Sequence, residues 1–340
     1  EQALLAETPI SVGVIDEATI ALDKPSHPAQ IIGQVPGAAV AVTNGEGHTT
    51  AIRQPFTTSP VYLFLEDGIP TRATGFFNHN GLFEIDVPQS GGIEVTRGPG
   101  TALYGSDAIG GIINVLTRAP GDALEFGASL EAGEHGWRRA LLDANVPTAA
   151  GGLRADLNLT ETDGWRDDTG YERQGGIVRW DHGIGENGRL QTNFGFSTID
   201  QQTGANSPLT RDDFRNNPTV NYLGIAFRKV DALRLNSTYE HRSGDDLFAF
   251  TALLRDNSMD LLASFALNFD PTISSVENQS IGFLGRWRRD LTDAFDSTLI
   301  VGVDFDYSPG ERSENAINVV TSGGGASRRF TDFSLGQTIY

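Results

Sequence analysis

Regular alternation of apolar and polar residues in the last two thirds of the chain limits the possible fold more than any other feature. In the clearest stretches, apolar residues (Leu153, Ala155, Leu157 and Leu159; Leu299, Val301, Val303, Phe305 and Tyr307) alternate with polar ones or glycine (Arg154, Asp156, Asn158 and Thr160; Gly302, Asp304 and Asp306). Residues 190–197 and 233–239 repeat the pattern. Because successive side chains of a strand point to opposite faces, this period predicts strands with one apolar and one polar face. We therefore expect β-structure from about Asp122 onward.

The connections between these strands alternate in length. Short ones, "PTAAGG" (147–152) and "GIGENG" (183–188), alternate with long charged ones, "DGWRDDTGYERQ" (163–174) and "DQQTGANSPLTRDDFRNNP" (200–218). Outer-membrane barrels have short turns at one end and long loops at the other. A soluble β-sandwich with its polar face in water would show the same alternation of side chains, so periodicity alone leaves both folds open.

The first third of the chain combines short helices and short strands. "ISVGVID" (10–16) predicts a strand that ends at a helix N-cap, and "HPAQIIGQ" (27–34) predicts a short helix. "VYLFLEDGIP" (61–70) predicts a buried strand followed by an Asp-Gly turn. Elements this short indicate an α+β module and not a doubly wound sheet. The 40 glycines and 19 phenylalanines, beside one methionine, also favour turns and strands over helices.

Charge and composition exclude several classes of protein. The 44 acidic and 25 basic residues give a net charge of −19, so nucleic acid is not an expected partner. The absence of cysteine excludes disulfides and thiol nucleophiles. The sequence has no apolar run of about 18 residues and no leader before Glu1, so we expect neither a transmembrane helix nor a signal peptide. If the protein is exported, this is its processed form.

A glycine-rich stretch, "IEVTRGPGTALYGSDAIGGIINVLTR" (93–118), invites comparison with phosphate-binding loops. It lacks the Lys and Ser or Thr of a P-loop and the glycine spacing of a dinucleotide site, and Pro99 separates its first two glycines. Its glycines are therefore predicted to allow turns and close backbone approach. The six histidines form no metal-binding pair, and no serine stands in a nucleophile elbow. We expect no catalytic residue, no metal site and no cofactor.

Several of these blocks together resemble the plug domain of TonB-dependent outer-membrane receptors. The resemblance lies in "VYLFLEDGIP" followed by the glycine-rich stretch, and in the upstream "ETPISVGVIDEATI", "AQIIGQVPGAAV" and "TTAIRQP". It covers most of residues 7–118. It implies an α+β plug domain at residues 1–120 and an antiparallel transmembrane β-barrel at residues 121–340, in the bacterial outer membrane.

The barrel is expected to be incomplete in this chain. Residues 121–340 suffice for only about 10 to 12 strands, at roughly 20 residues for each strand and its connection, whereas plugged transporters have about 22.

The resemblance also implies where function lies. Arg97, at the position of the arginine in the family's R-G-P motif, is expected to pair with barrel carboxylates and lock the plug to the wall, with Glu94 in the same network. The loop at residues 71–84 is expected at the outward-facing end, with residues 53–59 nearby. The residues expected to contact ligand offer charge, aromatic surface and hydrogen-bonding groups: Arg53, Arg72, Phe76, Phe77, Asn78, His79 and Asn80.

By this resemblance the protein is not an enzyme but a receptor for ligand-gated active import. A ferric siderophore or similar iron complex is the expected cargo, because Arg53 and Arg72 suit an anion; heme, cobalamin and saccharides are the alternative cargoes. The implied partners are the periplasmic energy-transducing protein TonB, the small-molecule ligand and outer-membrane lipid. A second hypothesis stays open here: a secreted acidic β-rich hydrolase or binding protein whose first third only mimics a plug.

Overall fold

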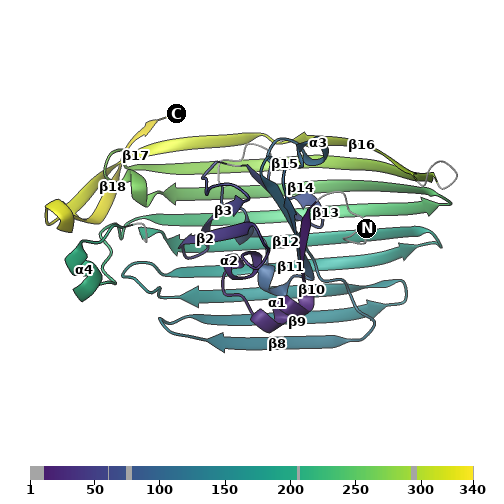
Figure 1. The fold of residues 1–340 in the computed structure, drawn as a ribbon, viewed down its shortest axis with the longest axis horizontal. Helices are drawn as coiled ribbons and strands as arrows, with labels where there is room; N and C mark the ends of the chain where they lie inside the picture. The colour runs from purple at the N-terminus through teal and green to yellow at the C-terminus, as the bar shows by residue number, and fades with distance from the viewer. Residues whose placement is uncertain (1–10, 60, 74–78, 205–206, 292–296, 340) are drawn as a thin grey trace.

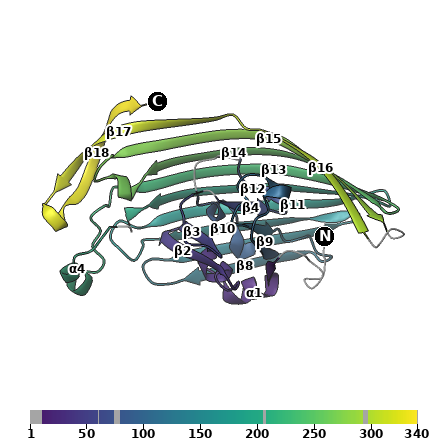
Figure 2. The same cartoon turned by 45° about the horizontal axis from the view of Figure 1, so that its top comes forward.

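The computed structural model of the protein describes residues 11–59, 61–73, 79–204, 207–291 and 297–339. These residues form two parts, an N-terminal α+β domain and a long antiparallel sheet, here called the wall. Figures 1 and 2 show the N-terminal domain lying against one face of the curved wall. Within the described ranges, no helix has the length and apolar character needed to cross a membrane.

The N-terminal domain is built on a five-stranded sheet. In spatial order its strands are β1 (Val12–Asp16), β6 (Gly92–Arg97), β7 (Gly111–Leu116), β4 (Tyr62–Glu66) and β5 (Ile69–Pro70), with β4 and β7 parallel and the other pairs antiparallel. The remaining elements are the hairpin of β2 (Ala38–Asn44) and β3 (Gly47–Ile52), the helices α1 (Glu17–Asp23), α2 (Pro28–Ile32) and α3 (Thr101–Tyr104), and the 3-10 turns Leu82–Glu84 and Val87–Gln89. The predicted α+β module is confirmed.

Local sequence explains where the first helices begin. The Asp16 side chain accepts a hydrogen bond from the backbone N–H of Thr19 at 2.8 Å and so caps α1, as predicted. In α2, proline occupies the first position, where its missing N–H has no helical partner, and His27 accepts from the N–H of Ala29 at 3.0 Å. Both helices bury isoleucines in a core that they share with the central strands: Ile20, Ile31, Ile32, Ile93 and Ile113 are each at most 1 % exposed.

The glycine-rich stretch forms β6, α3 and β7, and its glycines have the predicted structural role. Gly105, just after α3, has a φ of 84°, in a region that side chains rarely adopt. At Gly111, an added Cβ would lie 2.7 Å from the carbonyl oxygen of Thr96 on the neighbouring strand. The glycines therefore permit close packing of backbone, and the stretch is not a nucleotide-binding loop.

The wall is an eleven-stranded antiparallel sheet formed by strands that follow one another along the chain. They are β8 (Glu125–Ala132), β9 (Arg138–Thr148), β10 (Gly151–Thr162), β11 (Tyr171–Ile184), β12 (Gly188–Gln202), β13 (Phe227–Ser243), β14 (Asp246–Leu262), β15 (Thr272–Leu291), β16 (Ser297–Tyr307), β17 (Gly310–Ser322) and β18 (Arg329–Ile339). Among these strands, β8 and β18 stand at the two ends of the strand order and do not pair with each other. The barrel is therefore open here, as the chain length predicted.

Two of these strands share one edge of β15. β16 pairs with its second half and β17 with its first half, so residues 297–316 run along β15 with a break at Ser308 and Pro309. Proline has no N–H to donate to a strand ladder, which accounts for the break. The carbonyl of Pro309 accepts from the N–H of Gln279 at 3.2 Å, so the chain stays attached to β15 as it crosses from one strand to the other.

Burial in the wall is inverted relative to a soluble protein. In β13, Arg234 and Asn236 are 5 % and 6 % exposed, whereas the alternating Leu233 and Leu235 are 47 % and 40 % exposed. A soluble sandwich buries its apolar face and turns its polar face to water. A membrane barrel does the opposite, with its polar face turned to the lumen. The wall therefore has the side-chain arrangement of a transmembrane barrel, and the soluble β-sandwich is the wrong alternative.

The connections of the wall differ at its two ends, as predicted. The turns after β9, β11 and β13 are short, whereas the connections after β10, β12 and β14 are longer, and the one after β12 contains α4 (Arg211–Asn216). In Figure 1, α4 lies at the left end of the sheet. By the rule for such barrels, this end is extracellular. The last strand of the N-terminal domain ends at Leu116 and the wall begins at Glu125, on either side of the expected boundary at residue 120.

Replacing Ile113 with Ala tests the core of the N-terminal domain. Ile113 is fully buried, so the change should cost about 2–5 kcal/mol through lost transfer free energy and the cavity left behind. Amide hydrogen exchange of β6 and β7 would report the loss as faster exchange. Ile109→Ala is the matched control, because that side chain is 54 % exposed and the change should stay within about 0.5 kcal/mol. Equal exchange in both variants would contradict this description of the core.

Candidate functional site

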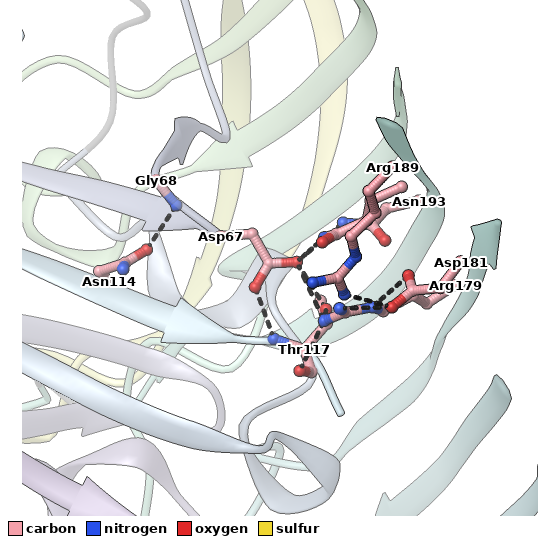
Figure 3. Close-up of polar contacts among 9 residues, drawn as sticks. Asp67, Gly68, Asn114, Thr117, Arg179, Asp181, Arg189 and Asn193 are labelled. Atoms are coloured by element: carbon pink, nitrogen blue, oxygen red, sulfur yellow. Dashed lines mark hydrogen bonds and ion pairs between the residues drawn. The ribbon is translucent and has the colours of Figure 1, made fainter. Parts of the chain in front are cut away.

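The Asp-Gly turn between β4 and β5 joins the N-terminal domain to the wall. Asp67 and Gly68 have φ values of 51° and 80°, the left-handed conformations of a tight hairpin turn. Within its own domain, the Asp67 carboxylate accepts from the N–H and the hydroxyl of Thr117 at 2.9 and 2.5 Å. From the wall it accepts from Gln191 at 2.9 Å and from Asn193 at 2.8 Å, and Figure 3 shows it between Thr117 and Asn193. One carboxylate thus bridges the two parts.

Arg179 of β11 extends this network along the wall. Its Nε and Nη2 donate to the two oxygens of Asp181, each at 2.9 Å, and Arg189 donates to the same carboxylate at 2.6 Å. Its Nη1 donates to the hydroxyl and the carbonyl of Thr117 at 3.0 and 3.2 Å and lies 4.0 Å from Asp67 Oδ2. Figure 3 shows these contacts converging beside the end of β7. Arg179 therefore ties that end of the central sheet to the wall.

Glu66, beside the turn, forms a buried ion pair with Arg234 of β13. Arg234 Nη2 lies 3.1 Å from Glu66 Oε1, and each side chain is 6 % exposed. Burial raises the pKa of Glu66, while the positive charge of Arg234 opposes that rise. Removing one partner of such a pair generally costs about 3–5 kcal/mol, because the other charge is left buried and unpaired. The pair therefore strongly favours the docked position of the domain.

The turn between β2 and β3 makes a second buried ion pair, nearer the extracellular end. Glu46 Oε2 lies 3.1 Å from Arg173 Nη1, and both side chains are 3 % exposed. Arg173 Nη2 also donates to the carbonyl of Ile85 at 2.7 Å, and the N–H of Glu46 donates to Gln201 of β12 at 3.1 Å. This turn is thus held by β11 and β12 together.

Glu84 connects the segment after β5 to the wall. Arg72 donates to Glu84 Oε1 at 2.8 Å, and Asn257 of β14 donates to Glu84 Oε2 at 3.2 Å. Arg255, also in β14, donates to the carbonyls of Pro70 and Arg72 at 3.0 and 2.9 Å. The backbone at Pro70 and Arg72 and the side chain of Glu84 are therefore attached to the wall.

Most charges across the contact have one arrangement. The N-terminal domain supplies carboxylates and the wall supplies guanidinium groups, in Glu46 with Arg173, Glu66 with Arg234, and Asp67 near Arg179. Arg118, in the connection between the two parts, pairs in the opposite sense with Asp156 of β10. In the part of the chain that the structure describes, no three His, Asp or Glu side chains are grouped so that they could hold a metal ion.

Comparison with known families decides what this arrangement belongs to. Residues 5–112 match the family model described as TonB-dependent Receptor Plug Domain. The N-terminal domain is therefore a plug domain of the TonB-dependent receptor type. The N-terminal domain is called the plug from here on.

The named proteins that this chain resembles include transporters and receptors for different ligands. It is 34 % identical over 165 residues to the vitamin B12 transporter BtuB of Vibrio vulnificus (strain CMCP6), a match that covers 47 % of this chain and 26 % of the relative. Its fold resembles the siderophore receptor PiuA of Acinetobacter baumannii (TM-score 0.73, 18 % identity, 98 % of this chain, 49 % of PiuA). It also resembles the unliganded ferric citrate transporter FecA (TM-score 0.77, 15 % identity, 98 % of this chain, 50 % of FecA). The chain thus spans about a quarter of the curated relative and about half of these structures.

The expected pairing of Arg97 with barrel carboxylates does not occur among the described residues. Arg97 Nη1 donates to the carbonyl of Pro36 at 2.8 Å, and Glu94 accepts from Asn114 at 2.9 Å, so both are bound inside the plug. Arg97 ends β6, where its N–H donates to the carbonyl of Ser11 beside β1. Its side chain therefore reaches the plug's own backbone, and the contacts with the described wall have the reverse polarity, with wall arginines and plug carboxylates.

The two arginines expected to contact ligand lie in different surroundings. Arg53 is exposed, has a φ of 54° and donates to Ser11 Oγ at 3.2 Å. Arg72 is 9 % exposed and pairs with Glu84 at 2.7 Å, above the ring of Phe83 at 5.2 Å from its centroid. The structure does not bring the two together, and Arg72 has a structural role whether or not ligand also reaches it. Ligand contact by either stays a prediction.

The other expected ligand residues divide into two groups. Phe76, Phe77 and Asn78 lie outside the described residues. His79 is partly buried, and its Nε2 lies 3.1 Å from Asn80 Nδ2. Asn80 is fully buried and accepts from the N–H of His48, so it helps to hold the fold of the plug.

Three histidines of the plug are held as neutral groups. His48 is fully buried; its Nε2 accepts from the N–H of Leu82 at 3.4 Å, and burial and the neighbouring His27 lower its pKa well below the usual value. Burial also lowers the pKa of His27. Burial, with the charges of Arg228 and Arg72, lowers the pKa of His79 to about 4. Acid would therefore introduce positive charge where the plug already faces wall arginines.

Analysis of the sequence did not single out the residues that hold plug and wall together. They are Glu46, Glu66 and Asp67 of the plug and Arg173, Arg179 and Arg234 of the wall. A partial signal was present, since Arg234 stands between Leu233 and Leu235 on the polar face of an alternating strand. The charge of an arginine at such a position needs a partner on the lumen side of the strand. This indicates a carboxylate on the domain that fills the lumen.

Replacing Arg234 with Met tests the lock. The change leaves Glu66 buried without its cation and should loosen the plug by about 3–5 kcal/mol. Faster amide exchange in β4 and increased entry of a large antibiotic that the intact outer membrane excludes would report it. The double variant Glu66→Met/Arg234→Met removes both charges and should recover most of the loss. Arg286→Met, at a 55 % exposed side chain, is the control and should change little. If the plug were held more weakly in the double variant than in either single variant, the role of the Glu66–Arg234 pair in docking would be contradicted.

The low pKa of His79 predicts a pH dependence of plug stability. Because its folded-state pKa is about 4 and its ordinary pKa is 6.5, the undocked or unfolded state binds more protons between these values. Stability should therefore fall as the pH falls from 6.5 to 4, with no further loss from this group below that range. Thermal unfolding of the wild type and His79→Gln across this range measures the effect. The variant should lose less stability than the wild type as the pH falls. An equal loss of stability in the two proteins would contradict the low pKa of His79.

Proposed function

We propose that this chain is part of a receptor that imports a ferric siderophore or a similar iron complex across the bacterial outer membrane, gated by the ligand and energised by TonB. The receptor is proposed to act as a transporter and not as an enzyme. The observation that carries the proposal is the set of buried ion pairs between plug and wall, because they fix the plug against the lumen side of the wall.

Gating is supported by the kind of interaction that holds the plug. The pairs Glu46–Arg173 and Glu66–Arg234 are buried, and leaving one charge of either pair buried without its partner would cost about 3–5 kcal/mol. A ligand can shift the plug only by as much as it binds the displaced state more tightly than the docked state. We propose that TonB supplies the energy that separates the two surfaces.

The wall is proposed to contact outer-membrane lipid through its exposed apolar row. Leu233, Leu235 and Leu254 are each at least 40 % exposed on the face opposite the plug-facing arginines. Burial of such a row in hydrocarbon is favourable, whereas its exposure to water is not.

Iron complexes are the favoured cargo for two reasons. Arg53 and Arg72 lie in the segments expected to face the outer end and suit an anionic chelate. Structures with the same fold include a siderophore receptor and a ferric citrate transporter. Cobalamin is a second candidate, favoured by the 34 % identity to the vitamin B12 transporter over 165 residues.

Uptake measurements separate these cargoes. A strain that lacks the gene for the whole receptor should lose uptake of radiolabelled iron from at least one ferric siderophore, and the gene should restore it. The same cells should take up labelled cyanocobalamin normally. Loss of cobalamin uptake alone would favour the second candidate, and normal uptake of every compound would contradict import of either cargo.

A further inference from the structure

Arg228 of β13 is buried in the lumen without a partner for its charge. The residue is 8 % exposed, and its Nε and Nη1 have no hydrogen-bond partner. Among the described residues, it makes no ion pair with a carboxylate. Arg173 and Arg234, the wall arginines described above, each pair with a plug glutamate. Because a guanidinium stays charged at any physiological pH, Arg228 is an uncompensated buried cation.

The plug surrounds this guanidinium without neutralising it. The guanidinium carbon lies 5.6 Å from the centre of the Phe83 ring, and a Cβ at Gly47 would come within 3.0 Å of Nη1. The nearby plug carboxylates are already occupied, since Glu46 pairs with Arg173 and Glu84 with Arg72. The plug thus brings an aromatic face and close backbone to Arg228 but no negative charge.

Other groups around Arg228 add to the positive field. The guanidinium carbon of Arg72 lies 5.2 Å from the centroid of the same Phe83 ring. The charges of both arginines lower the pKa of His79. On the wall, Arg228 pairs across the sheet with Gln201 and Leu261, neither of which carries charge. An anion placed here would therefore meet the unpaired guanidinium of Arg228 beside an aromatic surface, whereas the charge of Arg72 is already paired with Glu84.

The position of Arg228 in the wall makes it reachable from outside the cell. It is the second residue of β13, directly after the longest connection of the wall, at the end that the loop lengths assign to the extracellular side. His79, beside it, is only partly buried. The cation therefore lies at the outer rim of the contact between plug and wall.

An unpaired buried charge costs several kcal/mol and is not expected to persist without a compensating role. We propose that Arg228 is the centre of an anion-binding subsite, which takes an oxyanion of the cargo such as a carboxylate or a catecholate oxygen. The subsite forms between the wall and the plug, beside the ring of Phe83. This inference rests on the proposed import function and deepens it, because it favours an anionic iron complex over cobalamin.

Thermal unfolding of the whole receptor in the presence of inorganic phosphate tests the subsite without knowledge of the cargo. Added phosphate at constant ionic strength should raise the melting temperature of the wild type, because it binds the native state through Arg228. Arg228→Met should abolish this rise and should leave the anion-free receptor at least as stable, since it removes an unpaired buried cation. Arg286→Met removes an exposed arginine and should keep the response to phosphate. An equal rise in Arg228→Met and the wild type would overturn the proposal, whatever the cargo is.

Ligand binding provides the second readout. Arg228→Met should bind ferric citrate, or a ferric tris-catecholate, about ten- to a hundredfold more weakly than the wild type. Binding of an uncharged ferric trihydroxamate should be unchanged. The affinity of Arg228→Lys for the charged complexes should lie between those of the wild type and Arg228→Met. Equal losses for charged and uncharged complexes would show a merely structural role and overturn the subsite. If the receptor binds none of these complexes but still responds to phosphate through Arg228, the proposed cargo fails and the anion subsite stands.

Discussion

The pairing of plug carboxylates with wall arginines is the interaction on which the rest of the structure depends. Apolar contact alone, such as that of Phe83 with Ile199, Val230 and Met259, has no direction and would allow the plug to slide along the wall. A buried ion pair has a defined geometry and a large penalty for separation. Glu46 and Glu66 therefore fix the register between the small domain and the sheet, together with the hydrogen bonds that Asp67 and Glu84 accept from the wall.

This arrangement gives the receptor a polar interior. The centre of the plug is an ordinary apolar core, but between plug and wall many buried groups are Asp, Glu, Asn, Gln and Arg, beside the apolar cluster around Phe83. Such groups are stable only when their hydrogen bonds are made, so docking is specific and sensitive to single changes. It is also reversible in a way that an apolar core is not, because water can solvate each polar group once the surfaces part. A plug that must move is better held by such contacts than by a continuous hydrophobic interface.

Local features could be predicted from the sequence because they are encoded within a few residues. Alternation gave the strands, Asp16 and Pro28 marked helix starts, and the Asp-Gly pair predicted the turn between β4 and β5. The pairs that hold the plug could not be predicted, because their partners lie 127 and 168 residues apart. Which residues pair depends on where the plug lies on the sheet, and no local sequence pattern contains that information. The pairing expected of Arg97 is likewise not seen among the described residues, where its side chain reaches the carbonyl of Pro36, and its role as a lock stays a prediction.

The turn at Asp67 combines two requirements in one side chain. Its left-handed backbone favours Gly, Asn and Asp, while the four hydrogen bonds that it accepts from Thr117, Gln191 and Asn193 need an acceptor with two oxygens. Glycine would satisfy the backbone and lose every acceptor, and asparagine would keep the turn but replace one oxygen with a donor. Of these three residues only aspartate meets both requirements, so replacing it with glycine or asparagine would separate the shape of the hairpin from its attachment to the wall.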